Sequence, residues 1–272
     1  MSTWLGQYCL NVTDLDRAVA FYETLGLECT SRTDIAEASE AIVENPRKGS
    51  KLQLAQQKGQ SGPLHMGNAF WKLYVNTNDI ATMHQAAVDA GHRSIMAPLR
   101  LEQWPMSIGF VADPDGYQVE LAQRHPWTDG DDTTAAWLGQ YCINVTDLDR
   151  SVGFYEALGL TCTSRTEIPD AFEAILENPE KGSKVQLAQQ KAQEGPIDMG
   201  TAMWKLYVNT DDVQALYDAA MAAGCESVME PTHLDRWPVT MAYVKDFDGY
   251  LVEFVEYDDA PPAGVPNPKA HS

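Results

Sequence analysis

The stretch WLGQYCLNVTDLDRAVAFYETLGL at residues 4–27 returns as WLGQYCINVTDLDRSVGFYEALGL at residues 137–160. The repeat keeps its register to the end of each copy, because Glu120 and Glu253 have the same spacing of 133 residues (253 − 120) as the two stretches. A period of this length is a whole small domain and not a solenoid unit. The 272-residue sequence therefore predicts two tandem copies of one domain.

A polar segment rich in turn-forming residues, RHPWTDGDDTTAA, separates the copies. It divides the chain into a first repeat at 1–123, a linker at 124–136 and a second repeat at 137–256. The tail at 257–272 has four prolines and little apolar surface to bury, so we expect it to be disordered.

Within each copy, strand-like and helix-like patterns alternate. In the first copy, residues 6–12 suit a strand, and residues 13–26 place their apolar side chains on one helical stripe that opens at a cap and stops at a glycine. The second half of the copy repeats this order. We therefore predict an α+β fold of four βαβββ modules. In the first copy its helices lie at 13–26 and 77–91, and its strands at 6–12, 27–33, 40–44, 50–56, 70–76, 94–99, 106–113 and 117–123.

The composition narrows the class of protein. No run of eighteen apolar residues and no secretory signal pattern is present, so we expect a cytoplasmic protein that does not span a membrane. The five cysteines form no C-x-x-C pair, which agrees with a reducing compartment. The formal net charge of −20 disfavours nucleic acid and acidic membranes as partners and favours cationic over anionic ligands.

Two motifs in each copy carry a family resemblance. The first helix reads V-x-D-L-x-R-x-V-x-F-Y-x-x-L-G-L, and the turn before the last strand reads D-P-D-G-Y-x-V-E-L in the first copy. Together they resemble the vicinal oxygen chelate superfamily, which includes glyoxalase I, the bleomycin resistance proteins and the extradiol dioxygenases. The resemblance covers nearly all of 4–123 and 137–256, and it implies curved mixed sheets around ligand cups. It does not fix the reaction, because one fold can host unrelated chemistries.

In catalytic members the resemblance implies a divalent metal at four strand positions. Zinc, nickel and iron prefer imidazole, thiolate or carboxylate donors. Each set of positions keeps one carboxylate and has no histidine, so we predict no tightly held catalytic metal. A weakly held divalent metal stays open, with Gln7, Gln53 and Glu253 as one ligand set and Gln140, Gln186 and Glu120 as the other. The remaining position falls on Phe70 in the first copy and Met203 in the second.

A lysine can take the place of the metal's charge. Strand alternation puts Lys72 on the same face as Phe70, and Lys205 on the same face as Met203. The resemblance implies that this face lines a cup, where a buried ammonium can polarise a carbonyl while a glutamate acts as general base. The alternative is a lysine–glutamate ion pair that only satisfies two buried charges.

Tryptophans and asparagines complete the predicted ligand sites. Trp104 and Trp237, each followed by proline, are candidates for the rim of a cup, whereas alternation places Trp71 and Trp204 on the helix side of their strands. Glutathione-dependent members use an arginine to bind the glutathione carboxylate, and here that position falls on Asn11 and Asn144. An amide cannot make this charged bidentate contact, so we expect no glutathione dependence.

The two copies can associate in two ways. Each copy can close on itself, as in dioxygenase domains, or the copies can exchange halves and form a pseudo-dimer within one chain. The sequence leaves both open. In the swapped arrangement one cup would contain Gln7, Gln53, Met203, Lys205 and Glu253, and the other Gln140, Gln186, Phe70, Lys72 and Glu120.

We predict a small-molecule binding protein of the glyoxalase and bleomycin-resistance type, with two cups for a hydrophobic or cationic ligand and without the usual metal. The alternative is a lyase or isomerase with Glu120 and Glu253 as general bases and with Lys72 and Lys205, or a weakly held metal, as electrophile. Whether the protein is an enzyme is left open at this point. A ring-cleaving dioxygenase is disfavoured, because it needs two histidines and a carboxylate on iron.

Overall fold

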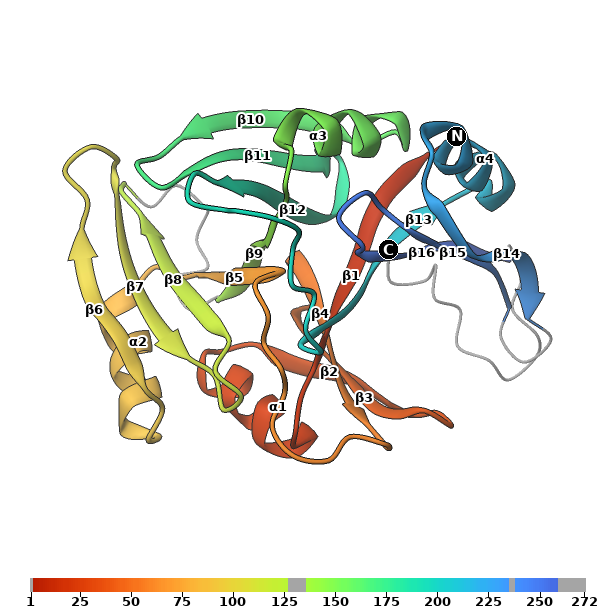
Figure 1. Ribbon diagram of the computed structural model, residues 1–272. Helices are drawn as coiled ribbons and strands as arrows, with labels where there is room; N and C mark the ends of the chain where they lie inside the picture. Colours follow the sequence, from red (N-terminus) through yellow and green to blue (C-terminus); the bar gives the residue numbers. More distant parts are fainter. Residues whose placement is uncertain (1, 127–135, 235–237, 259–272) are drawn as a thin grey trace.

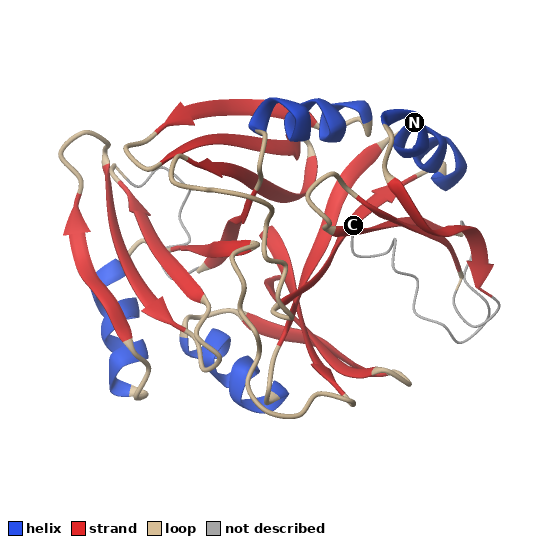
Figure 2. Cartoon of the chain, viewed as in Figure 1, coloured by secondary structure: helices blue, strands red, loops and turns tan. Residues whose placement is uncertain are grey.

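The computed structural model describes residues 2–126, 136–234 and 238–258, and Figures 1 and 2 show their arrangement. Most of the predicted linker (124–136) and tail (257–272) lies outside these residues. Arg124 and Tyr257, assigned above to the linker and the tail, instead end the last strand of each repeat. None of the helices in the three ranges has the length and apolar composition needed to cross a membrane.

The structure confirms the α+β fold and the order of its elements. The first repeat contains β1 (Thr3–Asn11), α1 (Leu15–Thr24), β2 (Glu28–Asp34), β3 (Ala38–Asn45), β4 (Lys48–Gln57), β5 (Phe70–Asn76), α2 (Ile80–Asp89), β6 (Ser94–Arg100), β7 (Met106–Ala112) and β8 (Gln118–Arg124). The second repeat contains β9 (Trp137–Asn144), α3 (Leu148–Ala157), β10 (Thr161–Glu167), β11 (Ala171–Asn178), β12 (Lys181–Gln190), β13 (Met203–Thr210), α4 (Val213–Ala223), β14 (Glu226–Leu234), β15 (Val239–Lys245) and β16 (Leu251–Tyr257).

The strands form two curved half-sheets, and each half-sheet combines strands from both repeats. One has the order β2-β3-β4-β1-β13-β16-β15-β14, and the other has the order β10-β11-β12-β9-β5-β8-β7-β6. In the middle of each half-sheet an antiparallel pair joins the two repeats. The pair is β1 with β13 in the first half-sheet and β5 with β9 in the second. In Figure 1, β1 and β13 lie side by side although they come from different repeats. The structure therefore adopts the swapped arrangement, a pseudo-dimer within one chain.

The helices cover the outer side of the strands and keep contacts within their own repeat (Figure 2). Helix α1 contacts α2, and α3 contacts α4. Between the half-sheets, the equivalent residues Tyr8 and Tyr141 stack with their ring centroids 4.0 Å apart. The hydroxyl of Tyr117, from the DPDGY turn, lies 2.7 Å from the carbonyl oxygen of Asn11 and 2.8 Å from that of Ala202. This hydroxyl therefore donates a hydrogen bond shared between the two repeats.

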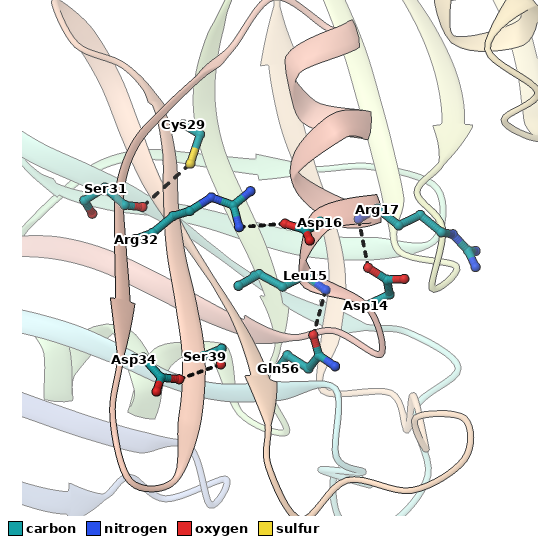
Figure 3. Close-up of polar contacts among 10 residues, drawn as sticks. All are labelled: Asp14, Leu15, Asp16, Arg17, Cys29, Ser31, Arg32, Asp34, Ser39 and Gln56. Carbon is teal, nitrogen blue, oxygen red and sulfur yellow. Dashed lines mark hydrogen bonds and ion pairs between the residues drawn. The ribbon is translucent and has the colours of Figure 1, made fainter.

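Polar contacts fix the first module in place (Figure 3). The carboxylate of Asp14 caps α1 by accepting a hydrogen bond of 3.0 Å from the backbone N–H of Arg17. The side-chain oxygen of Gln56 in β4 accepts from the backbone N–H of Leu15, also at 3.0 Å, and ties the helix to the sheet. At the tip of the β2–β3 hairpin, Ser39 donates to Asp34 at 2.7 Å. These contacts hold α1 and β2–β4 as one unit.

The start of β4, directly after the turn from β3, depends on glycine. Gly49 has a φ of +93°, and a Cβ atom there would lie 2.4 Å from the carbonyl oxygen of Leu138 in the other repeat. Gly182 has a φ of +88° and makes the same close approach to Leu5. Both the backbone conformation and the contact with the opposite repeat therefore require a residue without a side chain.

Candidate functional site

A cavity of about 890 Å³ opens on the concave side of the first half-sheet. Its size is in the range of small-molecule sites. Strands from both repeats line it, because Gln7 and Gln53 come from β1 and β4, and Lys205 and Glu253 come from β13 and β16. We call this cavity the first cup, and the equivalent region around Lys72 and Glu120, between β12, β9, β5 and β8, the second cup.

The floor of each cup carries a buried lysine–glutamate ion pair. In the first cup, Nζ of Lys205 lies 2.8 Å from Oε2 of Glu253, and the side chains are 9% and 4% exposed. In the second cup, Nζ of Lys72 lies 2.8 Å from Oε2 of Glu120, with side-chain exposures of 11% and 7%. The two predicted catalytic pairs are therefore brought together at the same distance, and in the second cup the contact is also a hydrogen bond from Lys72 to Glu120. Such a pair can stabilise negative charge on a bound carbonyl oxygen.

Aromatic rings surround each ammonium. Nζ of Lys205 lies 4.3 Å from the ring centroid of Trp204, 4.9 Å from that of Tyr207 and 5.5 Å from that of Tyr243. The second cup repeats this arrangement around Lys72 with Trp71, Tyr74 and Phe110. The negative face of an aromatic ring attracts a cation, so these rings help to hold the charge of a lysine that is removed from water.

The predicted positions of Trp71 and Trp204 are wrong. Trp204 lines the first cup beside Lys205, and Trp71 packs against the buried residues Tyr74, Cys142 and Ala188 on the floor of the second cup. The reason is a β-bulge in each of β5 and β13, where two residues stand opposite one residue of the neighbouring strand. A bulge breaks strict alternation and sends two consecutive side chains towards the same cavity.

The same bulges remove Phe70 and Met203 from the cups. Phe70 faces the core, where its ring centroid lies 6.2 Å from that of Tyr8 and 5.7 Å from that of Tyr117. Met203 is buried in the same core and does not line the first cup. Their prediction as ligand-binding residues is corrected, because they lie on the opposite face from the lysine two positions further along.

The four glutamines lie on the floor of the cups, as the swapped arrangement requires. Gln53 is 4% exposed, and its Oε1 atom has no hydrogen-bond partner in the described residues although it is buried. In the second cup the equivalent Gln186 accepts a hydrogen bond of 3.3 Å from Nε2 of Gln140. A buried acceptor without a donor is unusual, and it belongs to a residue that lines the cavity. The floor of the first cup therefore holds a buried, unpaired acceptor.

The sequence analysis missed a second carboxylate in each cup. Glu40 of β3 lines the first cup, and its pKa is raised by burial and also by the charge of Glu253, while Lys205 and a hydrogen bond from Gln53 act in the opposite direction. Glu173 of β11 has a raised pKa for the same reasons, with Glu120, Lys72 and Gln186 around it. A signal was present, because a glutamate occupies the same position of a mostly apolar strand, ASEAIVEN or AFEAILEN, in both copies.

Asn11 and Asn144 do not face a ligand. The Asn11 side chain donates to the carbonyl oxygen of Thr201 at 2.8 Å and accepts from Nε2 of Gln57 at 2.8 Å. Asn144 makes the equivalent bonds to the Asn68 carbonyl oxygen and from Gln190. Both amides are occupied by the protein, so their prediction as ligand-binding residues is corrected. They hold the loops that precede β5 and β13.

The tryptophans predicted at the rim and two buried cysteines remain to be placed. Trp104 is 41% exposed, and Trp237 lies outside the described residues, although the following Pro238 lines the first cup. Cys9 and Cys142 are fully buried, and burial raises the pKa of both thiols. Neither thiol is therefore activated as a nucleophile.

The residues of the cups do not fit a tightly held divalent metal. Among the described residues, no group of three or more His, Cys, Asp or Glu side chains is placed to hold one. In the predicted set of Gln7, Gln53 and Glu253, the only carboxylate already contacts the ammonium of Lys205 at 2.8 Å. A metal bound there would meet a like charge at short range, and we derive no step through one.

The fold is a tandem pair of βαβββ repeats with two equivalent cups, and in each cup a lysine stands beside a glutamate. The family model of the Glyoxalase/Bleomycin resistance protein/Dioxygenase superfamily matches residues 4–121 and again residues 137–254. The chain belongs to this superfamily.

Two of the relatives found by comparison cover most of the chain. A protein of Arabidopsis thaliana named "Probable lactoylglutathione lyase, chloroplastic" is 27% identical over 257 residues, which are 91% of this chain and 71% of that protein. A lactoylglutathione lyase of Oryza sativa subsp. japonica is 26% identical over 267 residues, 91% of this chain and 87% of that protein. The crystal structure of glyoxalase I from Zea mays superposes with a TM-score of 0.82 at 23% identity and covers 94% of this chain and 92% of that one. This last similarity concerns the fold alone.

Proposed function

We propose that the chain is a lyase or isomerase that moves a proton at a carbon atom next to a carbonyl group. The observation that carries the proposal is the buried pair of Lys205 and Glu253 on the floor of a cavity of about 890 Å³. The ammonium stabilises the negative charge that develops on the carbonyl oxygen, and the carboxylates of the cup move protons. The names of the relatives support this interpretation over binding without reaction.

The proposed substrate is an uncharged or cationic carbonyl compound. Glu37, Glu40 and Glu253 line the first cup, and Lys205 is its only lining cation among the described residues, so its net charge is negative. A glutathione adduct carries carboxylates, and among the described residues no arginine lines the first cup to bind one. The relatives are named for a glutathione compound, and this substrate class separates the chain from them.

The chemistry proposed here uses no divalent metal, because Lys205 and Lys72 supply the positive charge. A small-molecule binding protein is the second candidate, since an ion pair closed by 2.8 Å contacts also satisfies two buried charges without any reaction. The cytoplasmic location stays a prediction, and the Arabidopsis relative is named as chloroplastic.

The test is hydrogen–deuterium exchange at the carbon next to the carbonyl, followed by proton NMR in D₂O. The probes are hydroxyacetone, which is uncharged, and S-lactoylglutathione, which is anionic. We expect catalysed exchange into hydroxyacetone, slower exchange into S-lactoylglutathione, and a loss of about 100-fold or more in a Lys72→Met/Lys205→Met variant. The control is Lys245→Met, which removes a lysine that pairs with Glu226 at the surface. Binding of a probe without exchange would favour the second candidate.

A further inference from the structure

We propose that Glu40 and Glu173 are the catalytic bases that act on the substrate carbon, while Glu253 and Glu120 serve the oxygen atoms beside the lysine. The inference rests on the proposed function and divides its proton transfers between two carboxylates of each cup. It also names the substrate class, an α-hydroxy ketone or α-hydroxy aldehyde.

The first argument is the position of the two carboxylates. Across the first half-sheet the order is β3, β4, β1, β13 and β16, so Glu40 and Glu253 come from opposite walls of the same cavity. The glutamines of β1 and β4 lie on the floor between them. A small substrate with its carbonyl oxygen at Lys205 therefore has one carboxylate beside the oxygen and another across its carbon atoms.

The second argument is the difference between these carboxylates. Glu253 is held by Lys205 at 2.8 Å, and its charge is occupied by this ion pair. Glu40 makes no ion pair among the described residues and is only partly buried, so one side of it remains open to the cavity. Burial and the charge of Glu253 also raise its pKa, which makes it a stronger base than an ordinary glutamate.

The third argument is the unpaired oxygen of Gln53. Gln53 lines the cavity, and its Oε1 atom is buried and has no donor among the described residues. A hydroxyl group on the carbon next to the carbonyl would supply the missing donor. The substrate class follows, because the cup offers a cation for a carbonyl oxygen, an acceptor for a hydroxyl and a base for the hydrogen between them.

The reaction balances without an oxidant or a metal. Glu40 removes a proton from the hydroxyl-bearing carbon, the electrons of the C–H bond form a C=C bond, and the carbonyl electrons move to the oxygen beside Lys205. The hydroxyl proton passes through Glu253 to this oxygen. Glu40 then returns its proton to the former carbonyl carbon, and the second oxygen becomes the carbonyl. The product is the isomeric α-hydroxycarbonyl compound.

The experiment compares Glu40→Gln/Glu173→Gln with the matched control Glu23→Gln/Glu156→Gln. The control removes two carboxylates at equivalent, exposed positions of helices α1 and α3, outside the lining of the first cup. Exchange of the hydroxyl-bearing carbon of hydroxyacetone is followed by NMR, with kcat and KM measured between pH 4 and 8. We expect the first variant to lose about 100-fold or more in kcat with little change in KM, and the control to keep the wild-type rate.

A second variant keeps the test decisive. Glu40→Asp/Glu173→Asp retains the carboxylates at a shorter reach, and we expect it to recover part of the exchange that glutamine abolishes. Undiminished exchange in Glu40→Gln/Glu173→Gln would overturn this inference and leave the proposed function standing. A wild-type protein that exchanges neither probe would overturn both.

Discussion

At the scale of single residues, each cup is defined by a lysine that supplies the positive charge expected from a metal. Lys205 and Lys72 stand beside the glutamates that the family resemblance assigned to a metal, and three aromatic rings enclose each ammonium. A buried charge without its partner is costly, whereas a pair removed together costs much less. Each partner therefore keeps the other from being a costly unpaired charge, in addition to its role in the proposed reaction. Single and double variants can separate these two roles.

Removing one partner of the buried pair should destabilise the protein more than removing both. We expect Glu253→Gln to lower the free energy of unfolding by about 3 kcal/mol, because the ammonium of Lys205 is left buried and unpaired. The Lys205→Met/Glu253→Gln variant should recover part of this loss. Urea denaturation measures both. As a control, Glu226→Gln breaks an exposed pair and should change the stability by about 1 kcal/mol or less.

A second residue-scale prediction concerns Asp113, in the DPDG turn. Burial raises its pKa from 3.8 to about 7, against the hydrogen bonds of 2.9 Å that it accepts from the backbone N–H groups of Asp115, Gly116 and Tyr117. Between these two pH values the folded state binds more protons than the unfolded state. The stability from this group is therefore fully present below pH 3.8 and is lost as the pH rises through 7.

The size of the pH effect follows from about 1.4 kcal/mol per unit of pKa difference, so we expect a loss of about 2–4 kcal/mol between pH 4 and 7. Asp113→Asn mimics the neutral acid and should flatten this part of the stability–pH curve. Asp170→Asn, on an exposed residue, should leave it unchanged. An unaltered slope in Asp113→Asn, measured by thermal melting at each pH, would show that the carboxyl is already ionised in the folded protein.

At the scale of helices and strands, periodicity predicted every element. It assigned side chains to the wrong face where the pairing of neighbouring strands is irregular. The helical stripe of α1 and the strand pattern of β4 follow from spacing alone. The bulges in β5 and β13 leave no distinct mark in FWKLYVN or MWKLYVN, because the extra residue is recognised only against the neighbouring strand. For this reason Trp204 was placed on the wrong side of its strand and Met203 in a cup, although Met203 lies in the core. Lys205, beyond the bulge, was placed correctly.

The first residues of β4 and β12 give a prediction at this scale. Gly182→Ala should lower the stability by about 1–2 kcal/mol from its left-handed backbone alone, and further because its Cβ would lie 2.4 Å from the carbonyl oxygen of Leu5. Gly59→Ala is the control, since a Cβ there meets nothing within 4 Å. Equal melting temperatures for both variants would mean that the start of β12 does not press on the opposite repeat.

At the scale of the whole molecule, the cups depend on how the repeats exchange halves. Both possible closures satisfy the same strand and helix patterns, so the sequence could not choose between them. The choice rests on contacts between distant residues, such as Cys9 opposite Lys205 in the β1–β13 pair. The same pairing explains why Glu40 was missed as a site residue, because its cup is completed by a strand that lies more than a hundred positions away in the sequence.

The swapped arrangement predicts which variants interact energetically. Gln53→Leu and Glu253→Gln lie in different repeats but in one cup, so their effects on hydroxyacetone exchange should be non-additive. Gln53→Leu and Glu120→Gln lie in one repeat but in different cups, and their effects should add. A double-mutant cycle of the exchange rate measures both couplings. The opposite result would mean that each repeat closes on itself.

The two cups should also differ in ligand preference. Tyr243 and Tyr257 of the first cup correspond to Phe110 and Arg124 in the second. Arg124 stands opposite Met106 just as Tyr257 stands opposite Val239, so it occupies the same register at the edge of its cup. We expect Glu120→Gln to reduce the exchange of S-lactoylglutathione more than that of hydroxyacetone, and Glu253→Gln to do the reverse. Equal effects on both probes would indicate equivalent cups.

The central claim is that a lysine, and not a metal, supplies the positive charge in each cup. The most direct measurement is the exchange rate of hydroxyacetone after exhaustive treatment with a chelator, with the metal content determined by elemental analysis, and again after addition of zinc, nickel, manganese or iron. The account predicts that the metal-free protein keeps its full rate and that none of the four ions raises it. Loss of exchange on chelation and its return with one stoichiometric metal would contradict the account and assign the reaction to a metal centre.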